Sequence, residues 1–371
     1  MTMTLEQFER QIKEGLAPLA GQEIQGVKVL FLSSDIGPWL DTGLALAAGD
    51  RVTLVLDGKV WLSRALNLSF EAPMAVWARI GEDGEVFRGV QATNTCVATT
   101  AGSLYLKLYP GERWLDAKGH YLGEPASINP DAGGGVSVAL ILWRHDADVR
   151  TVLRQLIDSD ATAWWAAGEL ERQTRDARQP PVGWHYLWEL GSSPVYAEVT
   201  PARSSGAPAR AIDLHTCNDT AILQKDVSIE LTPTTELLWT WKADRLPSTV
   251  AEDTLPTHDY MSIAVEFDNG RDLTFFWSHE MAVDQSFSCP LPGWNHRETH
   301  VVARSGTAEL GKWIDEKKNI QDYYAKAVGG DIPKRIVRVW LIGVSLFQKG
   351  EGSSQIGNIV LTDGNKFVRV Y

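Results

Sequence analysis

Apolar and polar residues alternate along most of this chain with the two-residue period of β-strands. The pattern begins at Val27 and continues to Trp143, in short apolar runs that are separated by turn residues such as Gly49 and Asp50. Short strands at such regular spacing are typical of antiparallel sandwiches and jelly rolls. We therefore predict one β-sandwich over residues 27–145.

Two segments have the three- and four-residue apolar spacing of amphipathic helices instead. The first lies at the N-terminus, within residues 1–26, and the second follows Asp146. The second ends at the double proline of residues 180 and 181, because proline cannot continue a helix. We predict an N-terminal helix in residues 1–26 and a helical connector over residues 146–182.

Strand periodicity returns after the double proline and continues to the C-terminus. A chain of 371 residues exceeds the size at which one core stops growing, so two domains are expected. The predicted fold class is mainly β, with two antiparallel β-sandwich (jelly-roll-like) domains joined by the helical connector. The second sandwich covers residues 183–371.

One stretch of the second half has helical spacing. Trp313, Glu316, Asn319 and Tyr323 recur at three- and four-residue intervals and would share one helical face. We predict that this mixed polar and aromatic stripe anchors a helix on the sandwich edge, with the lining of a pocket as the alternative.

Composition and charge exclude several classes of protein. The formal net charge is −12, without a compensating Lys/Arg cluster, so we expect no nucleic-acid partner. No stretch reaches the ~18 apolar residues that cross a bilayer, so we expect no membrane partner. The first residues carry alternating charges where an export signal has an apolar run, which predicts a cytoplasmic protein. A homo-oligomer remains possible.

The three cysteines, Cys96, Cys217 and Cys289, are far apart in the sequence and odd in number. This pattern argues against a disulfide framework and against a CxxC metal knuckle. We expect three free thiols.

The candidate chemistry gathers in one window, residues 258–300, which holds four of the eight histidines. Imidazole exchanges protons near neutral pH, and a neighbouring carboxylate can orient it, so we predict Asp259 and His279 as a catalytic acid/base pair. Strand alternation would place Trp277 and His279 on one face. The predicted ligand-binding residues are Trp277, Trp294, His258 and His296. The alternative role for His279 and His300 is to hydrogen-bond neighbouring strands.

Motifs of other chemistries are missing from the sequence. It has no GxSxG elbow, no Walker loop and no GxGxxG that opens a helix. A zinc site of His258, His279 and His296 is conceivable, but its ligand spacing is not that of known zinc motifs. We therefore expect that the protein does not require zinc. Calcium is possible, and no other cofactor is expected.

Four segments of the second half carry a family resemblance, namely LLWTWKADRLP (237–247), HDYMSIAVEFDNGRDLTFFWS (258–278), WIDEKKNIQDYY (313–324) and RIVRVWLIGVS…IGNIVL (335–361). In order and spacing they resemble the bacterial family called domain of unknown function 3047. The resemblance spans residues 183–371 and implies a β-sandwich like those of carbohydrate-binding modules. It implies no particular activity, because a fold alone does not fix function.

In the first half, WLDTGLALAAGDRVTLVLDG resembles the opening strands of calcium-dependent, galactose-binding bacterial lectins. In residues 27–145 this resemblance implies a calcium loop before the last strand. That loop reads EPASINPDAGGG here and offers Asn129 and Asp131, which is fewer oxygen ligands than the family uses.

The sequence contains 15 tryptophans, and an indole can either fill a core or offer a flat platform for a sugar ring. Together with the resemblances, this excess predicts that the sandwiches bind a carbohydrate-like or amphipathic small ligand. The alternative is a cytoplasmic enzyme of lyase, hydratase or cyclase type that uses Asp259 and His279. An exposed tryptophan platform would favour binding, and a closed cavity around that pair would favour catalysis.

Overall fold

The computed structural model describes residues 3–33, 39–65, 68–88, 92–108, 114–120, 133–175, 179–191, 193–291, 293–364 and 366–371. Its contacts divide the chain into two compact units, Met1–Ala177 and Arg178–Tyr371. Each unit contains two β-sheets that pack face to face, which confirms the predicted class of two antiparallel sandwiches. Among the described residues, no helix has the length and apolarity to cross a membrane.

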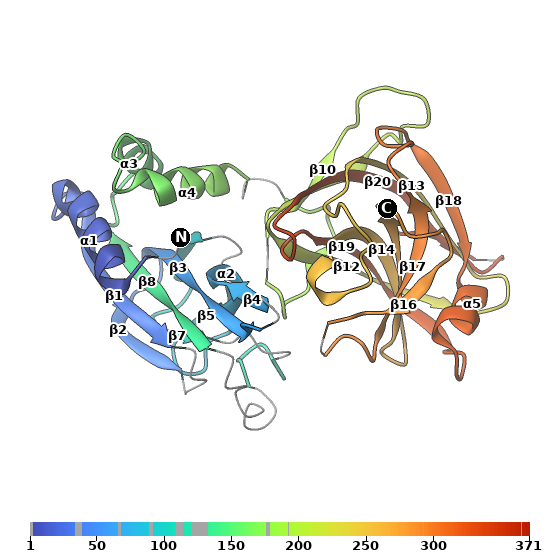
Figure 1. Ribbon diagram of the computed structural model, residues 1–371, viewed down its shortest axis with the longest axis horizontal. Helices are drawn as coiled ribbons and strands as arrows, with labels where there is room; N and C mark the ends of the chain where they lie inside the picture. Colours follow the sequence, from blue (N-terminus) through green and yellow to red (C-terminus); the bar gives the residue numbers. More distant parts are fainter. Residues whose placement is uncertain are drawn as a thin grey trace. The chain divides into compact units, whose positions relative to one another are not determined.

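The first unit contains a five-stranded and a three-stranded sheet (Figure 1). The larger sheet has the order β1 (Ile24–Ser33), β8 (Gly133–Trp143), β3 (Arg51–Ser63) and β4 (Leu68–Glu71), with β6 (Thr93–Val97) also paired to β3. The smaller has the order β2 (Leu40–Leu46), β7 (Gly102–Leu108) and β5 (Val76–Ile80), and the short helix α2 (Ala72–Ala75) precedes β5. Alternate apolar side chains of both sheets, such as Leu54, Leu104 and Val138, form the core between them.

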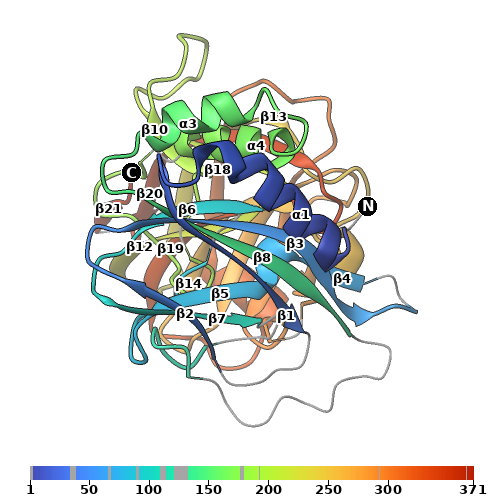
Figure 2. The same ribbon diagram turned by 90° about the vertical axis from the view of Figure 1, so that its left-hand side faces the viewer.

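Helices form a third layer of the first unit. They are α1 (Leu5–Leu16), the 3-10 turn η1 (Ala17–Leu19), α3 (Val149–Leu156) and α4 (Ala163–Arg175). Figure 2 shows α1, α3 and α4 on one side of β3 and β8, with β2, β5 and β7 on the other side. Phe8, Leu153 and Trp165 belong to the buried cluster under this layer, so the helices expected in the connector are packed as part of the first unit.

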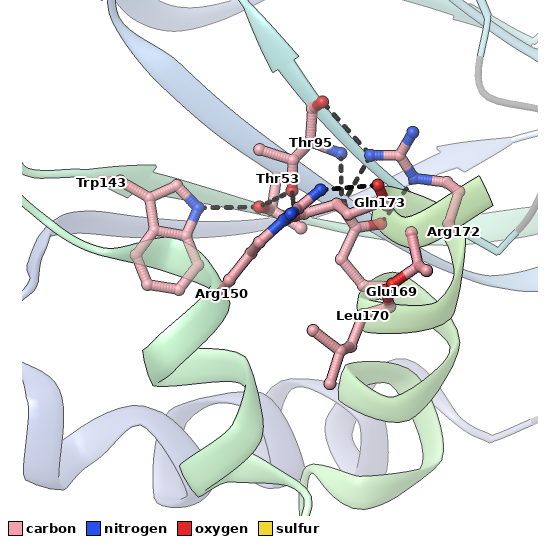
Figure 3. Close-up of polar contacts among 9 residues, drawn as sticks. Thr53, Thr95, Trp143, Arg150, Glu169, Leu170, Arg172 and Gln173 are labelled. Atoms are coloured by element: carbon pink, nitrogen blue, oxygen red, sulfur yellow. Dashed lines mark hydrogen bonds and ion pairs between the residues drawn. The ribbon is translucent and has the colours of Figure 1, made fainter. Parts of the chain in front are cut away.

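A buried ion pair fastens α4 to the sheet (Figure 3). Glu169, whose side chain is fully buried, accepts hydrogen bonds from Arg172 Nη2 at 2.7 Å and from the backbone N–H of Thr95 at 3.1 Å. Thr95 in turn lies 2.6 Å from the Thr53 hydroxyl, which accepts from the Trp143 indole at 2.7 Å. Burial raises the pKa of Glu169, but the hydrogen bonds from Arg172 and Thr95 outweigh it, so the pKa lies below its ordinary value.

The second unit is a sandwich of a six-stranded and a seven-stranded sheet (Figure 1). The six-stranded sheet has the order β10 (Tyr196–Val199), β11 (Ala211–Cys217), β20 (Glu351–Thr362), β13 (Glu236–Arg245) and β18 (Ile314–Asn319), with β21 (Phe367–Arg369) on β20. The seven-stranded sheet has the order β16 (Ser286–Ser288), β17 (Glu298–Ser305), β15 (Asp272–Ser278), β14 (Tyr260–Phe267), β19 (Arg335–Val344), β12 (Thr220–Glu230) and β9 (His185–Tyr186). All of these pairs are antiparallel except β15 with β17, which is parallel. Short helical turns complete the unit: η2 (Leu255–Thr257), α5 (Ile320–Tyr323) and the π-turn η3 (Tyr324–Val328).

Tryptophans meet across the centre of this second sandwich. Trp239 and Trp241 of β13 point inward and lie 5.9 Å from Phe275 and 5.5 Å from Trp277 of β15, between ring centroids. All four rings are at most 5% exposed. Core packing therefore accounts for these three indoles, as aromatic pairs at such distances stabilise a core beyond their buried area.

The predicted helix over residues 313–324 is wrong in its first half. Residues Ile314–Asn319 form β18, which pairs with β13 along its whole length, and only Ile320–Tyr323 are α-helical. If residues 314–319 were helical, the backbone N–H and C=O groups at that edge of β13 would have no partner. Pairing as a strand satisfies them, and this outweighs the helical spacing. Strand β6 was not expected from the sequence, because TNTCV is short and mostly polar.

The Glu169 ion pair leads to a stability prediction for the first unit. Glu169→Gln removes the buried carboxylate that accepts from Arg172, and breaking a buried ion pair typically costs about 3–5 kcal/mol. Hydrogen exchange followed by mass spectrometry should show exchange of α4 and β6 peptides accelerated by about 100-fold or more, since 1.4 kcal/mol is about tenfold. Glu14→Gln, at an exposed position of α1, is the matched control and should leave these rates unchanged. Unchanged exchange in Glu169→Gln would contradict a stabilising role for the pair.

Candidate functional site

The histidine window of residues 258–300 lies on the outer face of the seven-stranded sheet. That face carries a second small core, in which Tyr260, Phe276, Val302 and Trp340 are buried. Two segments outside the sheet close over it, since Ala251 and Phe347 pack against the same cluster, and Phe287 of the edge strand β16 completes it. Side chains of the window are therefore enclosed between the sheet and these covering segments.

Four polar side chains of the window meet inside this enclosure. They are His258, Cys289, Glu298 and His300, and their side-chain N, S and O atoms lie within 4.8 Å of one another. Cys289 Sγ is 3.4 Å from His258 Nε2, and His300 Nε2 is 3.5 Å from Glu298 Oε1. Both histidines are 0% exposed, Cys289 is 1% and Glu298 is 3% exposed. We call these four residues the buried polar cluster.

The local fold explains why these four residues converge. Glu298 and His300 are two residues apart on β17 and share its outer face with Val302. Cys289 follows β16, and its backbone N–H donates to the Glu298 carbonyl at 3.0 Å. His258 ends the turn η2, and its ring lies 4.7 Å from the ring of His300.

Aromatic rings surround the cluster. The His300 ring stacks on Phe287 with centroids 5.0 Å apart, and the Tyr260 ring lies 4.8 Å from each of the two imidazoles. Burial among these rings lowers the pKa of His258 to about 3. The imidazole of His258 is therefore neutral at physiological pH.

Asp259 fastens a loop rather than facing a cavity. Its carboxylate is 0% exposed and accepts hydrogen bonds from the backbone N–H groups of Phe347 at 2.9 Å and Gln348 at 2.7 Å. Burial raises the pKa of Asp259 to about 6 against the effect of these two donors. These contacts give Asp259 a structural role, and its predicted catalytic pairing with His279 stays a prediction.

The other predicted site residues lie in different surroundings. Trp277 is 1% exposed in the inter-sheet core and donates to the Gly306 carbonyl at 2.9 Å, so it packs the sandwich. Trp294 is half-buried, with the Arg297 guanidinium 5.0 Å from its ring, and His296 is exposed. His279 follows the end of β15 and is half-buried. Of the six residues predicted for the site, only His258 belongs to the buried polar cluster.

Sequence reasoning did not find Glu252, a buried carboxylate that organises the covering segments. Its two carboxylate oxygens accept from the Ser278 hydroxyl at 2.5 Å and from the His279 N–H at 2.8 Å. Its backbone carbonyl accepts from His258 Nδ1 at 2.8 Å. Burial raises the pKa of Glu252 to about 7.

A different kind of surface lies on the outer face of the six-stranded sheet. Here the strands alternate, with Leu214, Trp241 and Ile356 buried inside and polar side chains between them facing outward. We call the outward set the polar face; it consists of Asp213 and His215 on β11, Gln355 on β20, Lys242 on β13 and Asp315 on β18.

Three members of the polar face form a row across adjacent strands. Gln355 is directly opposite Asp213 on one side and Lys242 on the other, and its side-chain N–H donates to Asp213 Oδ1 at 3.1 Å. All three side chains are half-buried, so they are partly fixed and still reach the solvent. The ammonium group of Lys242 lies 2.9 Å from Asp244 and 5.8 Å from the ring centroid of Trp313.

The loop of residues 201–210 borders the polar face. Gly206 lies so near Trp313 that an added Cβ would be 3.2 Å from the Cβ of that tryptophan. A Cβ on Gly357 would meet the Arg210 carbonyl at 2.7 Å and Pro208 at 2.9 Å. The loop therefore lies against the sheet beside the row, and it flanks the half-buried indole of Trp313.

Residues 203–360 match the family described as "Protein of unknown function (DUF3047)". The resemblance expected for the second half is thereby confirmed over these residues. No curated protein matches the sequence.

Several solved structures are similar to parts of the chain. The family 30 carbohydrate-binding module of a cellulosomal cellulase of Clostridium thermocellum is 10% identical, with a TM-score of 0.28 over 51% of this chain and 96% of that one. The xyloglucanase domain of NopAA, a type three effector from Sinorhizobium fredii in complex with cellobiose, is 8% identical, with a TM-score of 0.30 over 50% and 94%.

A lectin, described as "EclA N-terminal domain; PllA-like lectin", is 16% identical, with a TM-score of 0.22 over 31% of this chain and 94% of that one. Asn129 and Asp131, the oxygen ligands considered for calcium, lie outside the described residues.

The raised pKa of Glu252 predicts how stability depends on pH. A carboxyl group with a folded pKa of about 7 and an unfolded pKa of ~4.3 stabilises the fold most below the unfolded value. Its contribution is lost as the pH rises through 7. Relative to Glu252→Gln, which mimics the protonated group, the wild-type free energy of unfolding should therefore fall between pH 4.5 and pH 7.5.

Urea unfolding at several pH values measures this difference. Asp253→Asn is the matched control, because the neighbouring Asp253 is exposed, and its pH profile should follow that of the wild type. Parallel wild-type and Glu252→Gln profiles would show that Glu252 is ionised in the folded protein throughout this range.

Proposed function

We propose that the protein binds a carbohydrate on the polar face of its second unit. The observation that carries this proposal is the row of Asp213, Gln355 and Lys242, which crosses three adjacent strands and points toward Trp313 beyond them. With strands ~4.8 Å apart, the distance from β11 to β18 is about 14 Å, which is wider than one sugar ring. The row thus suits a short oligosaccharide better than a monosaccharide.

The residue types of the row match the chemistry of a sugar. Carboxylate, amide and ammonium groups together accept from and donate to hydroxyl groups, which act in both ways. The hydrogen bond between Gln355 and Asp213 fixes both side chains before a ligand arrives, and this lowers the entropy cost of binding. An indole at the end of the row can stack on the apolar face of a sugar ring.

The charges of the polar face favour a neutral ligand. Lys242 is paired with Asp244, and Glu351 lies 2.8 Å from His215 and also contacts Arg245. Because Lys242 and Arg245 are each paired with a carboxylate, these cations offer no strong positive field to attract an anionic ligand. The buried polar cluster, by contrast, is enclosed and offers no exposed side chain to a ligand.

Isothermal titration of the full chain tests the proposal with two probes, β-1,4-galactotriose and a cello-oligosaccharide, followed by a wider glycan array. The first probe is the sugar in the structure of TmCBM61, a further similar structure, and the second extends the cellobiose in the structure of the xyloglucanase domain. Asp213→Ala removes a hydrogen-bonding carboxylate and Trp313→Ala the stacking surface. Each should weaken binding about tenfold or more, since lost contacts of ~1–3 kcal/mol have that effect.

The controls replace the same residue types outside the polar face. Asp226→Ala changes an exposed aspartate of β12 in the other sheet, and Trp188→Ala removes an indole that is 38% exposed next to β9. Both should bind the probe like the wild type. If no glycan binds, or if the control variants lose as much affinity as Asp213→Ala and Trp313→Ala, the polar face is not a carbohydrate site.

A further inference from the structure

The buried polar cluster combines the side chains that bind transition metals in proteins. Two imidazoles, one thiol and one carboxylate converge from three separate segments, with all donor atoms within 4.8 Å of one another. Thiolate, imidazole and carboxylate are the usual ligands of Zn²⁺. Hydrophobic packing alone would not gather four such groups where water cannot reach them, because each unpartnered polar group costs free energy when buried.

Two distances in the cluster fit the edges of a tetrahedron around one ion. Bonds of about 2.0–2.3 Å to Zn²⁺ at tetrahedral angles place neighbouring donor atoms about 3.3–3.6 Å apart. His258 Nε2 and Cys289 Sγ are 3.4 Å apart, and His300 Nε2 and Glu298 Oε1 are 3.5 Å apart. The first pair comes from the segments before β14 and after β16, and the second pair lies on β17. An ion between the two pairs would link these segments to the strand.

Neighbouring groups orient the donor atoms. His258 Nδ1–H donates to the Glu252 carbonyl at 2.8 Å, which directs the lone pair of Nε2 toward Cys289. Glu298 Oε1 accepts a hydrogen bond from the Tyr260 hydroxyl at 3.2 Å. The Thr274 hydroxyl lies between two carboxylates, 3.1 Å from Asp272 Oδ1 and 3.3 Å from Glu298 Oε1. Such outer hydrogen bonds to a backbone carbonyl and from hydroxyl groups are typical around metal ligands.

The buried ring of His300 has unsatisfied nitrogen atoms. Its side chain is 0% exposed, and neither ring nitrogen makes a hydrogen bond with any residue that the structure describes. Glu298 Oε1 lies 3.5 Å from His300 Nε2. A buried imidazole without hydrogen bonds is costly, whereas an imidazole that binds a metal is satisfied by it.

The charges in this region also favour a cation. Glu298 and Asp272 are both buried carboxylates, and the nearest guanidinium nitrogen, Arg297 Nε, is 4.0 Å from Asp272. As ligands, the Cys289 thiolate and the Glu298 carboxylate would supply two negative charges, which balance the charge of Zn²⁺. A neutral centre is compatible with complete burial, and an isolated carboxylate is not.

We propose that His258, Cys289, Glu298 and His300 bind one zinc ion as a structural crosslink. With four protein ligands and no exposed position, the centre has the closed form of structural zinc sites rather than the open form of catalytic ones. The ion joins the segment before β14, the segment after β16 and strand β17, and so holds the covering segments on the seven-stranded sheet. It is independent of the proposed carbohydrate site on the other sheet.

This ligand set differs from the one that the sequence suggested. The sequence suggested His258, His279 and His296 as conceivable zinc ligands and predicted that zinc is not required. His279 and His296 lie outside the cluster, whereas Cys289, Glu298 and His300 reach His258 only through the folding of the sandwich. A metal site assembled from distant segments has no characteristic spacing in the sequence.

Metal analysis of the full chain, purified without a metal-affinity column, tests the proposal first. One equivalent of zinc per chain is expected. Protein produced with Co²⁺ in place of Zn²⁺ should show the visible bands of tetrahedral Co²⁺ and a thiolate-to-cobalt charge-transfer band in the near ultraviolet. Cys289→Ser should abolish the charge-transfer band, and His300→Gln should reduce the bound metal to a substoichiometric amount.

Matched controls separate the cluster from other cysteines and histidines. Cys217→Ser replaces an exposed cysteine, and His279→Gln replaces a histidine of the same window outside the cluster. Both should retain one equivalent of metal and the cobalt spectrum. The wild type gives an answer even if a cluster variant fails to fold. Wild-type protein without stoichiometric zinc, whose melting temperature after refolding is the same with Zn²⁺ as with a chelator, would overturn the proposal.

Discussion

The second unit depends on one constraint: the central strands of its seven-stranded sheet are covered on both faces. Every residue of β14 and of β15 is buried, so inward and outward side chains alike are withdrawn from water. Apolar residues such as Phe276 satisfy this condition by packing, but the outward polar groups need partners inside the protein. The clamp of Asp259, the hydrogen bonds of Glu252 and the buried polar cluster all follow from this need. On the six-stranded sheet the residues of the polar face are half-buried or exposed, so they reach the solvent.

Much of the fold could be predicted from the sequence, because period and turn residues are local signals. The strands from β7 to β8, the helix α3 and the strand character of β13 to β15 all follow from apolar spacing. The helix expected over residues 313–324 shows where local signals are insufficient. Its spacing fits a helix, but pairing with β13 satisfies more backbone groups, and such long-range pairing cannot be read from one segment.

The site was less predictable for the same physical reason. His258 stood out because histidines are concentrated in its window, but residue counts do not show that Cys289 and Glu298 approach it from other segments. Trp277 was predicted to contact a ligand, and the structure places it in the inter-sheet core. The sequence does not show whether an indole is exposed or buried, and the ligand-binding role of Trp277 stays a prediction. The polar face did leave a local signal: in β13 the polar Lys242 alternates with the buried Trp241 and Ala243. Only the arrangement of the sheet shows that Asp213 and Gln355 continue its row.

The central claim is that the two outer faces of the second sandwich differ, one sealed around polar groups and the other open. Hydroxyl-radical footprinting of the native full chain measures this directly, because the rate at which each side chain is oxidised follows its exposure to solvent. The account predicts that His215 and Trp313 are oxidised, while Cys289, His258 and His300 are protected until the protein unfolds. Oxidation of His258 and His300 in the native protein at a rate like that of His215 would contradict it.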